Sequence, residues 1–94
     1  MRKLYVLNFD STKVNASTLH KAIKSSDLIT NWSHYIADSY IIQSSAGAKE
    51  LSMDIREKYG GNFTHYLFRL DKNYHGFMPK KQWAWLKARQ DWWR

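Results

Sequence analysis

Aromatic rings and cations alternate between Asp71 and Arg94, and residues of these types can do recognition chemistry. The rings are Tyr74, Phe77, Trp83, Trp85, Trp92 and Trp93, and the cations are Lys72, Lys80, Lys81, Lys87, Arg89 and Arg94. Since only Asp71 and Asp91 oppose these cations, the segment carries +4 of the formal net charge of +7. Rings stack on nucleobases or on protein, and cations bind phosphates. The segment therefore indicates a binding surface and a partner, and it names no reaction.

The charge of the whole chain is consistent with a polyanionic partner. An isoelectric point near 9.8 favours such a partner, because each phosphate neutralised by Lys or Arg releases counterions. A basic surface kept for solubility is the alternative, because the sequence has no long run of like charge. The charge leaves both interpretations open.

The common metal-binding, phosphate-binding and nucleophile motifs do not occur in the sequence. Cysteine is absent, so a disulfide or a thiolate metal site is impossible, and a reducing compartment is compatible with the sequence. The pair Gly60–Gly61 lacks the Lys and Ser/Thr of a P-loop. The histidines, which lack the spacing of zinc ligands, are His20, His34, His65 and His75. We expect no metal site, no cofactor and a binding protein rather than an enzyme.

The length of the chain indicates one small domain. Its 94 residues are enough for one domain and too few for two. A domain of this size has little stability to spare, so oligomerisation would help it. The apolar run Leu4–Phe9 is far too short for a signal-peptide core or a membrane span. We expect a soluble, cytoplasmic protein with no membrane contact.

The first strand and helix signals lie in the first quarter of the chain. Residues 3–9 are mostly apolar in both alternating sets, which is typical of a central strand covered on both faces. Asn15 is a candidate N-cap for a helix that runs to about Ser26. Val14 and Leu19 are placed to pack against each other across this cap, as a hydrophobic staple.

Further elements follow at regular intervals. Residues 32–44 are rich in aromatic and β-branched side chains and predict a hairpin. A second helix is expected over residues 46–59, because Gly60–Gly61 supplies the left-handed conformation that ends a helix. Residues 62–70 alternate as a fourth strand, and Pro79 suits the first turn of a third helix.

The order strand, helix, strand, strand, helix, strand predicts an α+β, ferredoxin-like βαββαβ fold with an added C-terminal helix. Two right-handed crossovers then place both helices on one face of a four-stranded antiparallel sheet with strand order 4-1-3-2. We assign residues 1–71 to this core and residues 72–94 to a C-terminal segment that packs on the core or on a partner. The opposite sheet face would carry Leu4 and Val6 and needs a cover, a second subunit or a ligand.

A third helix would sort the C-terminal aromatics onto two arcs. At 100° per residue one arc holds Trp83, Leu86 and Trp93, and the other holds Trp85, Ala88 and Trp92, with Arg89 between them. One arc can face the domain while the other meets a partner. The alternative is that both arcs are core.

Four stretches of the chain resemble a known family. They are the strand from Lys3 to Asp10, the hairpin from Trp32 to Gln43, and the segments 76–79 and 83–87. Together they are similar to the small bacterial proteins labelled SinR-like, which are distinct from the helix-turn-helix repressor of similar name. These proteins are similar in fold to the ferredoxin-like CRISPR adaptation subunit, a homodimer that binds duplex DNA. The resemblance implies the same fold and, by extension, a homodimer that contacts DNA.

The same resemblance assigns a possible role to Asp10. It matches the acidic residue that closes the first strand of the CRISPR subunit, where two copies across a dimer axis are thought to hold a divalent ion. Facing carboxylates suit Mg²⁺, and such a metal can activate water near a phosphate. An Asp at a strand end also forms turns or caps helices, so a turn is the alternative for Asp10.

The sequence therefore predicts a dimeric nucleic-acid-binding module that contacts DNA or RNA mainly through the backbone. The expected phosphate contacts are Arg2, Lys3, Lys72, Lys80, Lys81, Lys87 and Arg89. Trp85 and Trp92 are the expected interface residues. A protein-interaction accessory or inhibitor from a phage or mobile element, which docks through its Trp-rich segment, is the alternative. A Mg²⁺-dependent nuclease that uses Asp10 is a weaker one.

Overall fold

Strands and helices follow one another along the chain in the order predicted from the sequence. A computed structural model describes residues 2–89. The elements are β1 (Lys3–Phe9), α1 (Ala16–Ser25), β2 (Ile29–Ser33), β3 (Ser39–Ser44), α2 (Ala48–Tyr59), β4 (His65–Arg69) and α3 (Lys80–Lys87). The strands form one sheet of order β2-β3-β1-β4 in which every neighbouring pair is antiparallel. The predicted ferredoxin-like fold with a C-terminal helix is confirmed.

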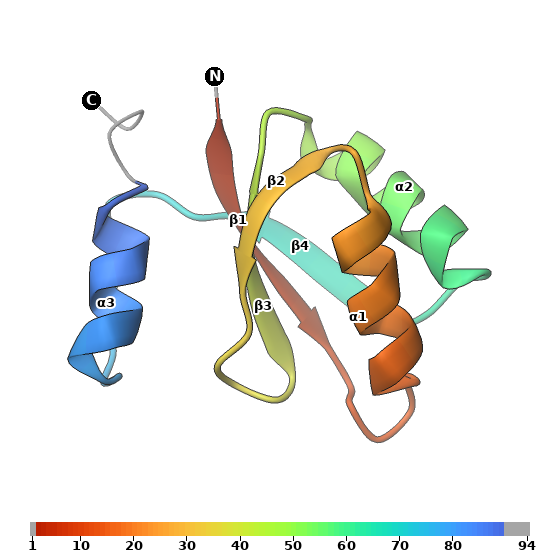
Figure 1. Cartoon of the computed structure of the whole chain (residues 1–94), viewed down its shortest axis with the longest axis horizontal. Helices are drawn as coiled ribbons and strands as arrows, with labels where there is room; N and C mark the ends of the chain where they lie inside the picture. Colours follow the sequence, from red (N-terminus) through yellow and green to blue (C-terminus); the bar gives the residue numbers. More distant parts are fainter. Residues whose placement is uncertain (1, 90–94) are drawn as a thin grey trace.

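The helices lie on opposite sides of this sheet. Figure 1 shows α1 and α2 together on one side and α3 apart from them on the other side. Among residues 2–89, none of the helices combines the length and the apolar character needed to cross a bilayer.

The signals at the helix ends act as the sequence indicates. The Asn15 side chain accepts a hydrogen bond from the Thr18 backbone N–H at 3.0 Å, which satisfies one of the free donors at the start of α1. Gly60 has a φ of 96°, and its N–H donates to the Arg56 carbonyl at the end of α2. Local signals in the sequence therefore mark where α1 begins and where α2 ends.

Three boundaries differ from the prediction. Strand β2 starts at Ile29 rather than at residue 32, and residues 34–38 form the loop of the hairpin. Polar residues and a register shift between Ile29 and Asn31 hide the start of this edge strand from a hydrophobicity pattern. Strand β4 is limited to residues 65–69 rather than residues 62–70.

The second helix also starts later than predicted, at Ala48. The Ala46 carbonyl accepts a hydrogen bond from the Tyr5 hydroxyl at 2.6 Å, and Gly47 is the N-cap. The residues before α2 therefore anchor a buried tyrosine of β1 instead of extending the helix.

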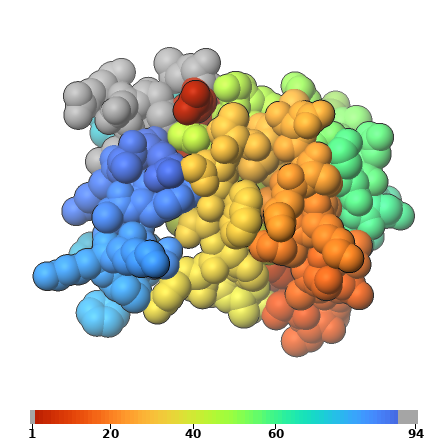
Figure 2. All heavy atoms as spheres, in the orientation of Figure 1, coloured from red at the N-terminus to blue at the C-terminus, as the bar shows by residue number. Residues whose placement is uncertain are grey.

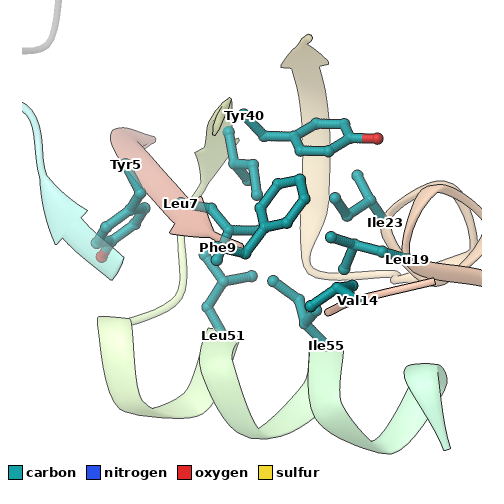
Figure 3. Packing of buried hydrophobic residues seen from close by; sticks show 10 residues of the cluster. Tyr5, Leu7, Phe9, Val14, Leu19, Ile23, Tyr40, Leu51 and Ile55 are labelled. Atoms are coloured by element: carbon teal, nitrogen blue, oxygen red, sulfur yellow. The ribbon is translucent and has the colours of Figure 1, made fainter. Parts of the chain in front are cut away.

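The hydrophobic core fills the space between the sheet and α1 and α2. Figure 3 shows the side chains of Tyr5, Leu7 and Phe9 of β1 pointing from the sheet toward the two helices. The buried cluster comprises Tyr5, Leu7, Phe9, Val14, Leu19, Ile23, Tyr40, Ile42, Leu51 and Ile55. Val14 and Leu19 belong to the same cluster, as the predicted staple requires. Since burial of apolar area is the main favourable term in folding, this face provides most of the stability of the domain.

The third helix packs on the other face of the sheet over β2 and β3. The Ser33 hydroxyl of β2 donates to the Gln82 side-chain oxygen of α3 at 3.1 Å. Met78, Gln82 and Trp85 share a hollow of about 30 Å³ with the β3 residue Ile41. Figure 2 shows the atoms of α3 directly against those of β2 and β3. The segment after β4 thus covers part of this face within the same chain.

Candidate functional site

Two neighbouring aromatic side chains of β4 remain open to solvent. Tyr66 and Phe68 are 55% and 61% exposed, and their ring centroids are 5.0 Å apart. Strand β4 is an edge strand, and its register pairs Tyr66 with Asn8 and Phe68 with Val6 of β1. We refer to Tyr66 and Phe68 together as the aromatic platform.

The platform faces away from α1 and α2. Paired residues of antiparallel strands project to the same face, and successive residues of one strand project to opposite faces. Leu7 of β1 points toward the helices (Figure 3), so Val6 and Asn8 point the other way. Tyr66 and Phe68 share that outward direction with their β1 partners.

His65 holds β4 against the helix layer. Its Nδ1 is 2.8 Å from the Phe63 carbonyl oxygen, and its Nε2 is 2.7 Å from the Ser52 hydroxyl of α2. A carbonyl can only accept, so Nδ1 carries the hydrogen and Nε2 accepts from Ser52. The hydrogen bond to Ser52 orients His65 toward α2. Because side chains alternate along a strand, Tyr66 then points outward.

One end of the platform is basic. The Leu70 backbone N–H donates to the Leu4 carbonyl at 2.8 Å, so the segment after β4 runs beside the start of β1. Arg2 and Lys72 are exposed there. Lys3 is half-buried, and it alternates with Leu4 in β1, so it points to the helix side with Tyr5 and Leu7. An acidic neighbour, Asp71, accepts a hydrogen bond from the Asn73 N–H. We refer to Arg2 and Lys72 as the basic end.

The other predicted cations belong to the C-terminal helix. Lys80, Lys81 and Lys87 are exposed on or at the ends of α3. Arg89 is half-buried, with its guanidinium 4.4 Å from the centre of the Trp85 ring and one N–H donating to the Trp85 carbonyl. Its own helix therefore holds Arg89, whereas the three lysines are open to a phosphate.

The predicted interface residues are less exposed than expected, where the structure describes them. Trp85 is half-buried and lines the hollow between α3 and the sheet. Trp83 is also half-buried, and its ring stacks on Tyr74 with 5.8 Å between centroids. Each predicted arc thus contributes a partly buried tryptophan to the chain's own packing. Trp92, Trp93 and Arg94 lie outside the described residues.

Phe77 is an exposed aromatic residue in the connection before α3. In the sequence it belongs to the same aromatic group as Trp83 and Trp85, but its ring is fully exposed whereas theirs are half-buried.

Asp10 forms a turn at the end of β1. Its Oδ1 accepts hydrogen bonds from the backbone N–H and the hydroxyl of Thr12, and these bonds hold the pKa of Asp10 below its usual range. The turn interpretation thus accounts for its contacts.

A second carboxylate, which the sequence analysis missed, lies near Asp10. Asp38 enters with the β2–β3 loop, because the Phe9 N–H donates to its carbonyl. Its side chain accepts from the Ser11 N–H at 2.9 Å, and hydrogen bonding with Ser11 lowers the pKa of Asp38. Both carboxylates border an open hollow of about 410 Å³ that also touches Tyr66. Within residues 2–89, His, Asp and Glu form no group of three suited to a metal ion.

The sequence carried a signal for the platform that was not used to locate the site. Tyr66 and Phe68 occupy alternate positions of the predicted fourth strand, so they share one face. The site was predicted after residue 71 instead, because aromatic residues are most concentrated there. The pattern could not show that α3 covers β2 and β3 and leaves β4 open.

Comparisons with known proteins give no relative. No family model matches the sequence, and the searches of curated proteins and of solved structures found no match. The resemblance to SinR-like proteins stays a prediction, and the site must be interpreted from its own geometry.

Proposed function

We propose that this protein is a nucleic-acid-binding module that contacts the phosphate backbone with little dependence on sequence. One observation carries the proposal: two exposed rings, on the part of the sheet face that α3 leaves uncovered, lie beside two exposed cations, Arg2 and Lys72. Aromatic surfaces and cationic tracks are the two components by which proteins hold single-stranded nucleic acid. The basic composition of the chain, with an isoelectric point near 9.8, supports the same conclusion.

The distribution of the cations favours backbone contacts over base readout. They lie at the start of β1, after β4 and on α3, so no helix gathers them for insertion into a major groove. Helix α3 is eight residues long and is tied to the sheet through Gln82. Phosphate binding by scattered side chains gives affinity and salt dependence without sequence preference.

We propose that the module acts as a homodimer whose contact lies in the C-terminal segment. The exposed Phe77 offers apolar area there, and a small domain gains stability from such an interface. Light scattering at micromolar concentration measures the mass, and a monomer contradicts the dimer without affecting the binding proposal.

A salt series tests the phosphate contacts. Replacing Lys80, Lys81 and Lys87 with Gln should flatten the slope of log affinity against log salt by up to about 3 on duplex DNA, since each phosphate contact contributes about 0.9. The variant Arg2→Gln/Lys72→Gln removes two cations and should also flatten it.

The matched control removes the same charge from the helix layer. The triple variant of the exposed lysines 21, 24 and 49 to Gln loses three positive charges on the opposite side of the sheet. It should keep the parent's slope apart from a small effect of net charge. If the control flattens the slope as much as the other variants, the contacts are not localised and the proposed surface is wrong.

Phe77 favours a second candidate function, a protein-interaction accessory. An exposed aromatic ring is a typical anchor at protein interfaces. An aromatic-anchored protein complex should keep its affinity as salt rises, because apolar contacts are not screened. If the parent chain binds neither duplex nor single strands at low salt, this function replaces the first.

A further inference from the structure

We propose that the aromatic platform stacks on unpaired bases, so that the module prefers single-stranded nucleic acid over duplex. This inference rests on the proposed function for the phosphate contacts and adds the form of nucleic acid that is bound. It assigns the base contacts to Tyr66 and Phe68 of β4, which are separate from the tryptophans of the C-terminal segment.

The geometry of the two rings suits a splayed strand. Their centroids are 5.0 Å apart and their planes are inclined by 45°. Successive bases of one duplex strand are only about 3.4 Å apart, and their faces are covered by neighbouring bases. A ring can reach a base face only where the bases are unstacked. The two inclined rings can therefore stack on the bases of an unpaired strand but not on the covered bases of a duplex.

The platform stays open because of where α3 packs. The contacts of α3 reach Ser33 of β2 and Ile41 of β3. The rings of β4 lie beyond the central strand β1, at the opposite edge of the sheet. Their exposed fractions of 55% and 61% show that the described chain leaves much of each ring free.

Charge gives the platform a direction. The basic end lies beyond Phe68, since Leu70 pairs with Leu4 at the start of β1. The carboxylates of Asp10 and Asp38 lie at the other end and border the same hollow as Tyr66. Phosphates are attracted to the first end and repelled from the second. A bound strand should therefore keep its phosphates near the Phe68 end, and Phe68 should contribute more to binding than Tyr66.

The exposed rings and the cations beside them favour nucleic acid as the occupant of the platform. A second copy of the chain could also pair along the free edge of β4. Such pairing uses backbone groups in the plane of the sheet, so it would leave the outward-facing rings of Tyr66 and Phe68 uncovered. Because cations border one side of the rings, a polyanion with flat apolar bases is complementary in both charge and shape.

The experiment compares single-stranded and duplex probes by fluorescence anisotropy. The probes are an oligothymidine and an oligouridine of about 12 nucleotides, within the range of single-strand site sizes, and a DNA hairpin. The double variant Tyr66→Ala/Phe68→Ala should bind the single strands roughly tenfold more weakly or worse, because each base–aromatic stack is worth about 1–3 kcal/mol. Its affinity for the hairpin and its salt slope should match those of the parent.

Three further variants separate stacking from other causes. Tyr66→Phe keeps the ring and should keep parent affinity, and Phe68→Ala should lose more than Tyr66→Ala. Tyr35→Ala is the matched control, because Tyr35 is a tyrosine of similar exposure, 54%, in the β2–β3 loop. It should bind every probe like the parent. Circular dichroism of each variant shows whether the fold is intact.

The outcomes distinguish this inference from the function on which it rests. If the double variant binds single strands as tightly as the parent while the salt slope stays steep, the platform does not stack and only the backbone proposal stands. If the folded parent binds no probe at low salt, both the proposed function and the stacking inference are wrong. If the double variant turns a dimer into a monomer, a second copy covers the platform and the inference is overturned.

Discussion

The two faces of the sheet are covered in different ways. On the helix side, α1 and α2 enclose a continuous cluster that includes Leu7 and Leu51, both fully buried. On the other side, one short helix rests on β2 and β3 through the Ser33–Gln82 hydrogen bond and beside Ile41, and its Leu86 is buried. Strand β4 carries the half-buried His65 and Leu67 on the first face and exposed rings on the second. The packing that stabilises the domain and the surface proposed for binding therefore lie on opposite faces of the same sheet.

The largest expected effect comes from the helix side. Leu7→Ala should lower the free energy of unfolding by about 2–5 kcal/mol, because it removes a fully buried side chain and leaves a cavity. Urea denaturation measures the change. Phe68→Ala on the other face is the matched comparison and should stay within about 0.5 kcal/mol of the parent. Equal losses for the two variants would contradict the division between the faces.

A smaller effect is expected where α3 meets the sheet. Leu86 is only 2% exposed, so Leu86→Ala should cost about 2 kcal/mol, at the lower end of the range for buried leucines. The loss should be local, because α3 contributes no member to the helix-side cluster. Amide hydrogen exchange should show faster exchange in α3 and unchanged protection in β1. Faster exchange throughout the sheet would mean that both faces fold as one unit.

The tie between α2 and β4 gives an effect of about 1 kcal/mol. Ser52→Ala removes the hydroxyl that donates to His65 Nε2 and leaves that nitrogen without this partner. The melting temperature should fall by roughly 4–8 °C for a domain of this size. Ser17→Ala, an exposed serine on α1, is the control and should not change it. If both variants melt like the parent, the hydrogen bond does not hold β4 in place.

The smallest expected effect is a pH dependence at the turn after β1. Hydrogen bonds from Thr12 lower the pKa of Asp10 in the folded chain, so folding is favoured when the carboxylate is charged. This contribution is complete above the ordinary Asp pKa of about 3.9 and is lost as pH falls through the lower folded value.

The free energy of unfolding of Asp10→Asn should therefore fall less below about pH 4 than that of the parent, because the variant has no carboxylate to protonate. Chemical denaturation at a series of pH values compares the two. The same stability curve in acid for the variant and the parent would show that Asp10 makes no contribution through its charge.

Local signals made much of the fold predictable. The alternation in β1, the Asn15 cap and the Gly60 helix end act over a few residues, so they can be recognised without the rest of the chain. The order of the elements then restricts the topology to a few arrangements. The start of β2 was missed because polar residues and a bulge break its pattern.

The candidate site was harder to predict because it depends on pairing and coverage. Asp38 lies beside the turn at Asp10 because strand pairing brings it to Ser11, from which it is separated by 27 in sequence number. The exposure of Tyr66 and Phe68 depends on which strands α3 covers. A tryptophan in the sequence does not reveal whether its ring packs inside its own domain, as Trp85 does. Composition could therefore suggest a kind of partner, but it could not show which aromatic rings are exposed.

The central position of β1 has a consequence for synthesis. This first strand pairs only with β3 and β4, which the ribosome makes later. Until residue 70 has emerged, one edge of β1 has no partner and displays unpaired backbone groups, which are a template for association between chains. The strand that carries the exposed rings is also the one that closes this edge. Any nascent chain that stalls before β4 should thus be prone to aggregate, and the sheet and the aromatic platform should be completed in the same step.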